Sequence, residues 1–396
     1  MRESGNGVEL EVQQELERFC LISSASSDVP GLWAMARAYA AALQEVGLTV
    51  QVEAQEGKPL LVAESPGAQP PYVLVVGHLD TVLPARPVLC QDGQLYGSGA
   101  VDMKGGLVAL LGALGLLQRQ GLAPPANLLV VVVPDEEASA AVSRAAMTHW
   151  GALAELALVM EPGERQGERE TLVLGRKGLG EFTLTFRGLA AHAGLAFHQG
   201  RSALLAACQF VAAAEALSAG SRTVNCCRLV AGDREFVTQL GSQAQLLTAS
   251  DRRNVVPDTA VVVGEFRFAR EEEGKALAVQ LEELARTVAR QREVEVVLAF
   301  GQWVAPVEAA AGSWLAELAQ QVATSLSLPL EVETCRGGIS LPNFFQRPDL
   351  PVVDGLGPVG GGMHTEEEFV DLRSLGQRTQ LVAQLLRRLA GRGAAL

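Results

Sequence analysis

The sequence contains few cysteines and few aromatic residues, and it lacks a long uninterrupted hydrophobic run. Its six cysteines are scattered over 396 residues with no C-x-x-C pair, which argues against a cysteine zinc site or a disulfide framework. We expect these cysteines to be free, buried thiols in a reducing compartment. The longest apolar stretch, Ala203–Ala219, is interrupted by Gln209 and Glu215, which is typical of a core helix and not of a membrane span.

Positive charge is also in short supply. Lysine and arginine number 32 against 45 aspartates and glutamates, a net charge of −13, which argues against a nucleic-acid or anionic-membrane partner. Solubility is the simpler explanation of this charge. Residues 1–7 are polar and lack the apolar segment of a secretory signal, so we expect a cytoplasmic protein.

The remaining composition is that of a well-folded globular protein. Hydrophobic residues make up 48% of the chain and charged residues 19%, and the length suggests two domains. Helical and strand patterns alternate up to Gly175 and again after about Gln302. We therefore expect an α/β fold with a mostly parallel sheet, formed by residues 1–175 and 301–396 as two parts of a catalytic domain.

Residues 176–300 show a different pattern. Their order of strand, helix, two strands, helix and strand predicts an inserted, ferredoxin-like α+β domain whose sheet has one exposed face. Ser242–Ala249 is expected to form one of its strands. Such a domain favours dimerisation through a sheet or a helix, so we expect a homodimer.

Five apolar, strand-like runs each deliver a carboxylate or a histidine at or just past their carboxyl end. Open parallel sheets build their sites outside the carboxyl ends of their strands. A set of two histidines and several carboxylates gathered there fits two divalent cations that share one carboxylate, which indicates a hydrolase. The runs are Pro71–Gly77 before His78 and Asp80, Leu95–Val101 before Asp102, Asn127–Pro134 before Asp135, Glu136 and Glu137, Leu156–Met160 before Glu161, and Pro351–Gly362 before His364.

Two of these segments have a simpler alternative explanation. His78 and Asp80 lie on the same side of an extended segment, so Asp80 can hold the far imidazole nitrogen of His78; the alternative is a surface turn. Asp102 lies at the start of a helix and could be only an N-cap. Combined with His78, however, Asp102 is a candidate bridging carboxylate.

The run Asp135-Glu136-Glu137 places three repelling acids side by side. A cation would relieve this repulsion if one glutamate binds it while its neighbour holds a water molecule; the alternative is a solvated loop. The three glycines before His364 suggest a close backbone approach to a ligand. His192 follows a short small-residue segment in the inserted domain, where ordinary packing is the alternative. His149 and His198 are expected to be structural.

Taken together, these motifs resemble the co-catalytic zinc amidohydrolases and exopeptidases, a family that includes glutamate carboxypeptidase, aminoacylase, acetylornithine deacetylase and succinyl-diaminopimelate desuccinylase. The resemblance covers almost the whole chain and is strongest to the glutamate carboxypeptidase branch, over Asp354–Thr365 and at Ser143-Arg144. The matching motifs are Gly77-His78-Leu79-Asp80-Thr81-Val82, Val101-Asp102-Met103-Lys104-Gly105-Gly106, Asp135-Glu136-Glu137, Met160-Glu161-Pro162, Ala191-His192-Ala193-Gly194, Asn254-Val255-Val256-Pro257 and Gly361-Gly362-Met363-His364-Thr365.

The resemblance implies a role for each of these residues. It implies two Zn²⁺ ions, with Co²⁺ or Mn²⁺ as possible substitutes. It also implies that the inserted domain is a dimerisation lid whose His192 reaches the partner subunit's active site and steadies the oxyanion. The implied assignments are His78 and Glu161 on one zinc, Glu137 and His364 on the other, Asp102 bridging both, Glu136 as general base, Asp80 orienting His78, and Asn254 and Arg267 gripping a substrate carboxylate.

The substrate itself remains open between alternatives. A carboxypeptidase that cleaves an amide next to a free carboxylate of a peptide or small molecule is one, and a deacylase of N-acyl amino acids is another. A non-catalytic metal-binding dimer is a third, which the intact Glu136 and His192 argue against. Relatives usually carry an aspartate after the glycine-rich turn at 337–340, where this chain has Leu341-Pro342 before Asn343. This departure bears on the substrate and not on the metals.

Overall fold

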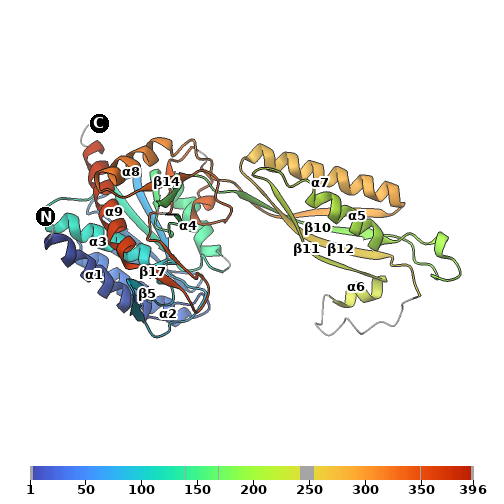
Figure 1. Cartoon of the computed structure of the whole chain (residues 1–396), viewed down its shortest axis with the longest axis horizontal. Coiled ribbons are helices and arrows are strands. Elements are labelled where there is room, and N and C mark those ends of the chain that lie inside the picture. The colour runs from blue at the N-terminus through green and yellow to red at the C-terminus, as the bar shows by residue number, and fades with distance from the viewer. Residues whose placement is uncertain (1–2, 139, 168, 241–253, 348, 394–396) are drawn as a thin grey trace. The chain divides into compact units, whose positions relative to one another are not determined.

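The computed structural model describes residues 3–138, 140–167, 169–240, 254–347 and 349–393. The chain forms two compact units (Figure 1). Met1–Gly175, Glu308–Arg336 and Ser340–Leu396 make up the first unit, and Arg176–Val307 with Gly337–Ile339 make up the second. The strand expected at Ser242–Ala249 lies outside the described residues.

The first unit is built on a six-stranded, mostly parallel sheet. Its order is β1-β2-β6-β3-β7-β15, in which β6, β3, β7 and β15 are parallel and β1 and β2 form an antiparallel hairpin at one edge. The strands are β1 Thr49–Gln55, β2 Lys58–Glu64, β3 Tyr72–His78, β6 Leu128–Val133, β7 Ala154–Val159 and β15 Val352–Val353. Every residue of β3 and β6 is buried, as expected for valine- and leucine-rich strands covered on both faces.

Helices cover this sheet. Side chains of α1, α2, α3, α8 and α9 share one hydrophobic core with the sheet, whereas α4 contacts β6 and β7 outside that cluster. Helix α2 begins at Val29, where the Asp28 carboxylate accepts the N–H of Gly31 as an N-cap. The helices are α1 Glu3–Cys20, α2 Val29–Glu45, α3 Lys104–Arg119, α4 Ala141–Ala152, α8 Ser313–Ser325 and α9 Leu372–Gly393.

Two of the five runs predicted as strands of the main sheet are different in the structure. Strand β5 ends at Tyr96, and the chain from Gly97 to Asp102 makes turns, with Gly99 in a left-handed conformation (φ +74°) that ends any strand there. After β15 the chain is irregular as far as the short β16. The expectation of a strand in the parallel sheet is therefore wrong for Leu95–Val101, and within Pro351–Gly362 it holds only for β15.

The unit also contains two small peripheral sheets, and residues of these two runs form β5 and β16 in one of them. One has the order β16-β17-β5-β4 and the other β14-β9-β8. Their strands are β4 Leu89–Gln91, β5 Gln94–Tyr96, β16 Gly360–Gly361, β17 Phe369–Asp371, β8 Arg165–Gln166, β9 Arg169–Val173 and β14 Leu330–Glu333. A short 3₁₀ helix, η3, spans Leu341–Phe344.

The second unit is a four-stranded antiparallel sheet with the order β11-β12-β10-β13. Burial alternates along β10, and its inward side chains Phe182 and Phe186 pack on Phe210 of α5. With its β-α-β-β-α-β order, this unit is ferredoxin-like, as the sequence predicted. Its elements are β10 Gly178–Arg187, η1 Phe197–Gln199, α5 Ala203–Glu215, β11 Thr223–Gly232, α6 Arg234–Leu240, β12 Thr259–Phe268, α7 Glu271–Arg292 and β13 Glu295–Val304.

The second unit closes on itself where the chain enters and leaves it. Arg176 and Val307 exchange two backbone hydrogen bonds of 3.0 and 2.9 Å, as a pair of antiparallel strand residues does. Strand β13 continues past the expected boundary at residue 300 to Val304. The chain therefore enters and leaves the stretch Arg176–Val307 at one place.

Membrane-spanning helices and the exposure of the cysteines were two further points on which the sequence made predictions. None of the described helices is both long enough and apolar enough to cross a lipid bilayer. All six cysteines are free, but only Cys20 is buried, while Cys90, Cys208 and Cys227 are exposed. The expectation of uniformly buried thiols is wrong, because three of the six cysteines lie on outward faces of two strands and a helix.

Candidate metal centre

Three neighbouring parallel strands bring the first set of predicted side chains together. In the order β6-β3-β7, β3 ends at His78, β6 is followed by Glu136 and Glu137, and β7 is followed by Glu161. Because these strands are parallel neighbours, their carboxyl ends meet at one edge of the sheet. His78, on the middle strand, lies between the acidic segments of the other two.

The other two candidate ligands reach the same edge from loops. Asp102 lies just before α3, and His364 follows β16. The His78 Nε2 atom is 3.2 Å from Asp102 Oδ1 and 3.8 Å from Glu161 Oε2. The His364 Nε2 atom is 3.4 Å from Asp102 Oδ2 and 3.2 Å from Glu137 Oε2. All five predicted ligands are thus brought together, and each oxygen of Asp102 faces a different histidine.

This geometry forms two candidate cation sites that share Asp102. His78, Asp102 and Glu161 form one, and Asp102, Glu137 and His364 form the other, with the potential ligand atoms of each group within 4.8 Å of one another. The Oε1 atom of Glu137 is buried and has no hydrogen-bond partner among the described residues. Imidazole nitrogens with carboxylate oxygens are the donor set of Zn²⁺ and similar divalent ions. The residues therefore fit a pair of divalent cations.

The electrostatics of the cluster agree with this fit. Burial, together with the neighbouring negative charges, raises the pKa of Glu136 and of Glu137 to about 7 and that of Glu161 to about 8. Hydrogen bonding to Asp102 raises the pKa of His364 to about 9. These acids are crowded enough to retain protons near neutral pH, so added positive charge would be stabilising here.

His78 is held in one orientation by the segment that follows it. Its Nδ1 atom lies 2.9 Å from the backbone carbonyl oxygen of Asp80 and 3.4 Å from the Oδ1 atom of Asp80. Both neighbours are acceptors, so the proton belongs on Nδ1 and Nε2 is left free as a ligand. The carbonyl of Asp80 is the closer partner, whereas the sequence suggested its side chain.

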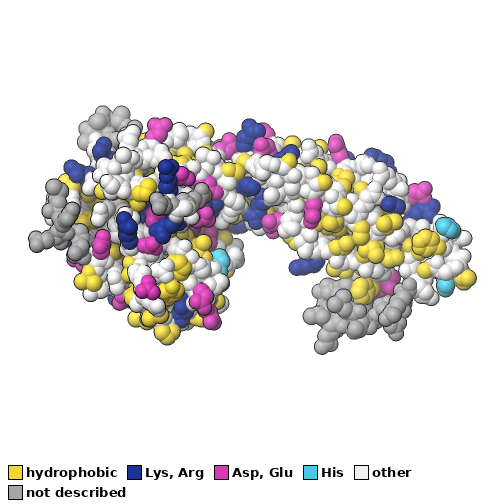
Figure 2. Space-filling model, viewed as in Figure 1, with side chains coloured by type: hydrophobic (Ala, Val, Ile, Leu, Met, Phe, Trp, Pro, Cys, Tyr) yellow, Lys and Arg dark blue, Asp and Glu magenta, His cyan; other side chains and the backbone are white. Residues whose placement is uncertain are grey.

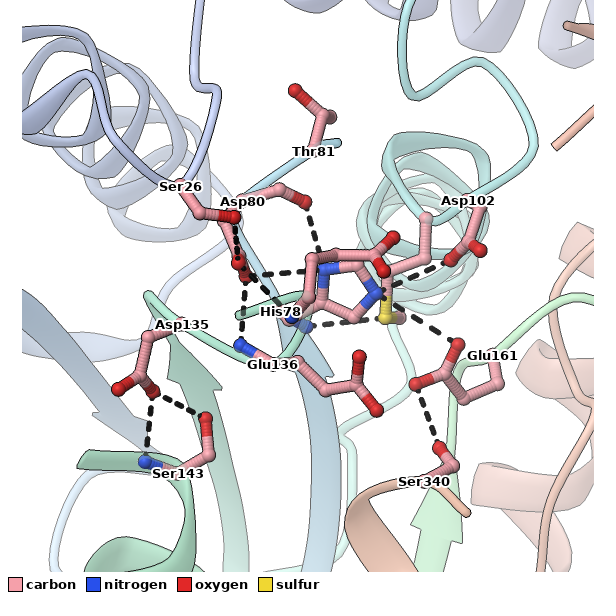
Figure 3. A network of polar contacts seen from close by, with 12 residues as sticks. Ser26, His78, Asp80, Thr81, Asp102, Asp135, Glu136, Ser143, Glu161 and Ser340 are labelled. Carbon is pink, nitrogen blue, oxygen red and sulfur yellow. Dashed lines mark hydrogen bonds and ion pairs between the residues drawn. The ribbon is translucent and has the colours of Figure 1, made fainter. Parts of the chain in front are cut away.

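The carboxylate of Asp80 has a second set of partners. It accepts the backbone N–H groups of Glu136 and Glu137, at 3.0 and 3.1 Å, and the hydroxyl of Ser26 at 2.7 Å (Figure 3). Asp80 therefore fixes the turn that carries both glutamates. Neither this role nor Ser26 was visible in the sequence, because Ser26 is distant along the chain and lies in no recognisable motif.

Asp135 does not join the cluster. Its carboxylate accepts the backbone N–H groups of Val142 and Ser143 and the Ser143 hydroxyl, at the start of α4 and away from His78 (Figure 3). It is thus a helix-capping residue. The three adjacent acids share one sequence motif but not one site.

Ser340 is a further residue that the sequence did not identify. Its hydroxyl donates to Glu161 Oε1 at 2.9 Å (Figure 3), which leaves Oε2 facing His78. The same hydroxyl accepts the backbone N–H of Asn343 in a capping box at η3. Because that N–H occupies an acceptor position, the hydroxyl proton is directed at Glu161. The only sequence signal was the departure from relatives in this turn.

The remaining candidates belong to the second unit. The exposed His192 accepts the backbone N–H groups of Gly194 and Leu195 at Nδ1, so its proton lies on Nε2. Asn254 is exposed and its carbonyl accepts the N–H of Ala193. The Arg267 guanidinium contacts the carboxylate of Glu265 at 3.2 Å.

Comparison with known proteins gives concordant results. The model of peptidase family M20/M25/M40 matches residues 74–388. Carboxypeptidase G2 of Pseudomonas sp. (strain RS-16) is 27% identical over 385 residues, covering 95% of this chain and 88% of the relative. Succinyl-diaminopimelate desuccinylase of Alkalilimnicola ehrlichii is 26% identical over 339 residues, covering 82% and 86%.

A solved structure shows the same fold. Aminopeptidase PepT from Bacillus cereus superposes with a TM-score of 0.79 at 19% identity, and the match covers 96% of this chain and 99% of that one. Both units are therefore part of the shared fold.

Proposed function

Because the chain belongs to peptidase family M20/M25/M40, and is therefore a hydrolase, we propose that it cleaves an amide bond next to a free carboxylate, in the manner of a glutamate carboxypeptidase. The observation that carries this proposal is the pair of candidate cation sites sharing Asp102. The similarity to carboxypeptidase G2 over 95% of this chain supports the choice of reaction.

In this proposal the cation ligands are those of the two candidate sites. His78 and Glu161 hold one cation, Glu137 and His364 hold the other, and Asp102 binds both. We propose Zn²⁺ as the metal, with Co²⁺ or Mn²⁺ able to replace it. When bound, two such ions polarise the scissile carbonyl and lower the pKa of water toward neutrality.

Glu136 is the proposed general base. The contacts of Asp80 fix its main chain, and burial raises its pKa to about 7, near the value that suits proton transfer at neutral pH. Glu136 takes a proton from the attacking water as the water oxygen bonds to the carbonyl carbon. It then delivers that proton to the nitrogen as the C–N bond breaks, which yields an acid and an amine.

His192 is the proposed oxyanion donor, acting on the active site of a second copy of the chain. Its Nδ1 atom is occupied as an acceptor, so Nε2–H is the end that can donate to a developing negative charge. A homodimer through the second unit is part of this proposal. Exposed hydrophobic side chains gather over α5 and β11 of that unit (Figure 2), among them Leu204, Leu205 and Leu229.

Asn254 and Arg267 are proposed to bind the substrate carboxylate. Asn254 is exposed and presents an amide donor. Arg267 is already paired with Glu265, so the substrate would have to share its guanidinium with that carboxylate. Asn254 is the simpler candidate of the two.

A deacylase of N-acyl amino acids is the second candidate function. The similarity to succinyl-diaminopimelate desuccinylase over 82% of this chain favours it, and the same cation cluster would serve. A non-catalytic metal-binding dimer is a third candidate, but the half-buried Glu136 beside the cluster, with a pKa suited to proton transfer, favours turnover.

A substrate panel with matched metal analysis tests these candidates. The purified chain would be stripped with a chelator, reloaded with Zn²⁺, Co²⁺ or Mn²⁺, and assayed on N-acyl glutamates, dipeptides and N-acetyl amino acids. We expect about two ions per chain and hydrolysis that the chelator abolishes, with the N-acyl glutamates preferred. Preference for acetyl or succinyl substrates would favour the deacylase. Two bound ions without hydrolysis of any of these substrates would contradict the proposal.

A further inference from the structure

Glu368 is a buried acid close to the cation cluster that has no role in the function proposed above. Its side chain is 5% exposed. Its Oε1 atom accepts the backbone N–H groups of Val101 and Asp102, at 3.1 and 3.0 Å, and its Oε2 atom accepts that of Gly99 at 2.8 Å. Three main-chain donors of the segment that carries the shared ligand Asp102 therefore converge on one carboxylate.

The main chain of Glu368 is attached to the same region. Its carbonyl oxygen accepts the N–H of Gly97 at 3.2 Å and the Arg86 Nη2 at 2.6 Å. Both ends of the residue thus bind the turn before Asp102. This turn belongs to no strand, and the Glu368 contacts add to its own bonds from Ala100 to Gly97 and from Lys104 to Gly99.

Glu368 also lies in the loop that carries His364. His364 has a left-handed backbone (φ +65°), as does Gly362 (φ +66°), a conformation that non-glycine residues keep only when their surroundings hold it. Thr365 ends a turn that begins at Gly362, and its hydroxyl and backbone N–H both donate to the carbonyl of Gly362. The attachment of Glu368 to the Asp102 segment fixes the far end of this loop.

We propose that Glu368 is a positioning residue that holds Asp102 and His364 in place for the cation they share with Glu137. This inference rests on the proposed function. Glu368 is not itself a ligand, since both of its oxygens are engaged by main-chain N–H groups. It acts by tying together the two loops that supply ligands without the support of the central sheet.

The other cation site has different support. His78 lies at the end of β3 and Glu161 follows β7, both within the central sheet, and Glu161 is oriented by Ser340. Loss of the Glu368 contacts is therefore expected to weaken chiefly binding of the cation at Asp102, Glu137 and His364, because the other cation depends on these contacts through Asp102 alone. Loss of the Ser340 hydroxyl is expected to weaken binding of the cation at His78, Asp102 and Glu161.

Metal titration of the full-length protein tests this inference. In Glu368→Gln, an amide N–H₂ group replaces one acceptor oxygen, so at least one buried N–H loses its partner. With Co²⁺ as the probe, followed by absorbance and calorimetry, we expect one of two binding steps to weaken by about 10- to 100-fold. Glu366→Gln is the control, because it removes the same charge from an exposed position in the same loop.

A double variant identifies the cation on which Glu368 acts. Ser340→Ala should weaken one step, and Ser340→Ala with Glu368→Gln should weaken both. If the double variant retains one step at parental affinity, the two residues act on the same cation and the inference is wrong. Parental affinity at both steps in Glu368→Gln would also overturn it.

Unfolding of the metal-free variants separates positioning from a general structural role. A residue that only stabilises the fold would lower the Tm of the metal-free protein and leave both affinities unchanged. If Glu368→Gln does not fold, Glu368→Asp keeps the charge but shortens its reach, and it should weaken the same step. A parent that binds two ions and hydrolyses substrate upholds the proposed function whatever these variants do.

Discussion

At the scale of single residues, the adjacent Glu136 and Glu137 illustrate how one turn supports two tasks. Both main-chain N–H groups are held by the Asp80 carboxylate, so their side chains start from fixed positions. Glu137 reaches His364 at 3.2 Å, whereas Glu136 groups with His78 without belonging to either Asp102-sharing site. The proposed ligand and the proposed base can therefore be adjacent in the chain.

Glu136→Gln should separate metal binding from turnover. The amide keeps the size of the side chain but cannot take up a proton, so kcat should fall by about 10²- to 10⁴-fold. Metal content should stay near that of the parent, because Glu136 is not one of the five proposed ligands. Steady-state kinetics and metal analysis of the same preparation check both statements. Turnover at the parental rate would show that Glu136 is not the base.

His192→Ala tests the proposed oxyanion donor. Loss of one such donor commonly reduces kcat by about 10²- to 10³-fold, and here dimer formation and metal content should not change. His198→Ala is the matched control, since His198 is another exposed histidine in the same loop and packs on Phe197. Equal kinetics for both variants and the parent would remove His192 from the mechanism.

The residue types of the site could be predicted from the sequence, but most of their partners could not. A histidine or acid at the carboxyl end of a buried parallel strand, or shortly after it, must lie at that edge of the sheet. This is why His78, Glu137 and Glu161 are found together. Asp135 shares that pattern, yet its carboxylate caps α4. Which nearby donor an acid binds depends on tertiary contacts, and these leave no periodic signal.

At the scale of elements, the close approach of α3 to the residue after β7 brings two of the proposed ligands together. A Cβ added at Gly106 would lie 1.9 Å from the Met160 carbonyl oxygen, and Met160 directly precedes Glu161. Only glycine permits this approach. The start of α3, and with it Asp102, is thus set against the end of β7.

Gly106→Ala should therefore destabilise the protein and loosen the site. We expect a loss of about 1–3 kcal/mol in the free energy of unfolding, together with weaker binding of the cation held by His78, Asp102 and Glu161. Gly115→Ala in the same helix is the control. Its Cβ would meet its nearest atoms at 3.6 and 3.9 Å, so it should gain about 0.5–1 kcal/mol. Denaturant unfolding of the metal-free proteins measures both, and equal stability of the two variants would contradict the packing argument.

Element prediction succeeded where hydrophobic patterning was strong and failed where short strands pair only locally. Strands β3, β6 and β7 were visible as apolar runs, and the alternating burial of β10 was visible as alternating residues. Leu95–Val101 also looked like a strand, but Gly97 and Gly99 turn the chain and the carboxylate of Glu368 takes up its N–H groups. A side chain 269 positions away from Gly99 decides that conformation, and local sequence does not encode it.

At the scale of the whole molecule, the cation cluster concentrates negative charge within a chain that is already acidic. In the folded protein without metal, Glu136, Glu137 and Glu161 have pKa values of about 7 to 8, against about 4.3 in an unfolded chain. Over the intervening pH range the folded state binds more protons than the unfolded state. Its stability must then fall as pH rises.

We expect the Tm of the metal-free protein to fall by several degrees between pH 5 and pH 8.5. The histidines act in the same direction, since the pKa of His364 is raised to about 9 and the stability this provides is lost as pH rises. Saturating Zn²⁺ should raise the Tm and flatten this dependence. Scanning calorimetry with and without the metal measures it, and a metal-free Tm that rises over this range would contradict the electrostatic argument.

The pairing of Arg176 with Val307 has a consequence for how the first unit tolerates the inserted residues. Loop closure becomes entropically harder as the ends of a flexible segment are joined over more residues. Here the inserted residues fold and their two ends are held together by the Arg176–Val307 hydrogen bonds. For the first unit, the insertion is therefore equivalent to a tight hairpin at that point. Inserting the whole domain therefore adds to the folding of the first unit only about the loop-closure entropy of a short turn. Sequence changes in one unit can then be accommodated without unfolding the other.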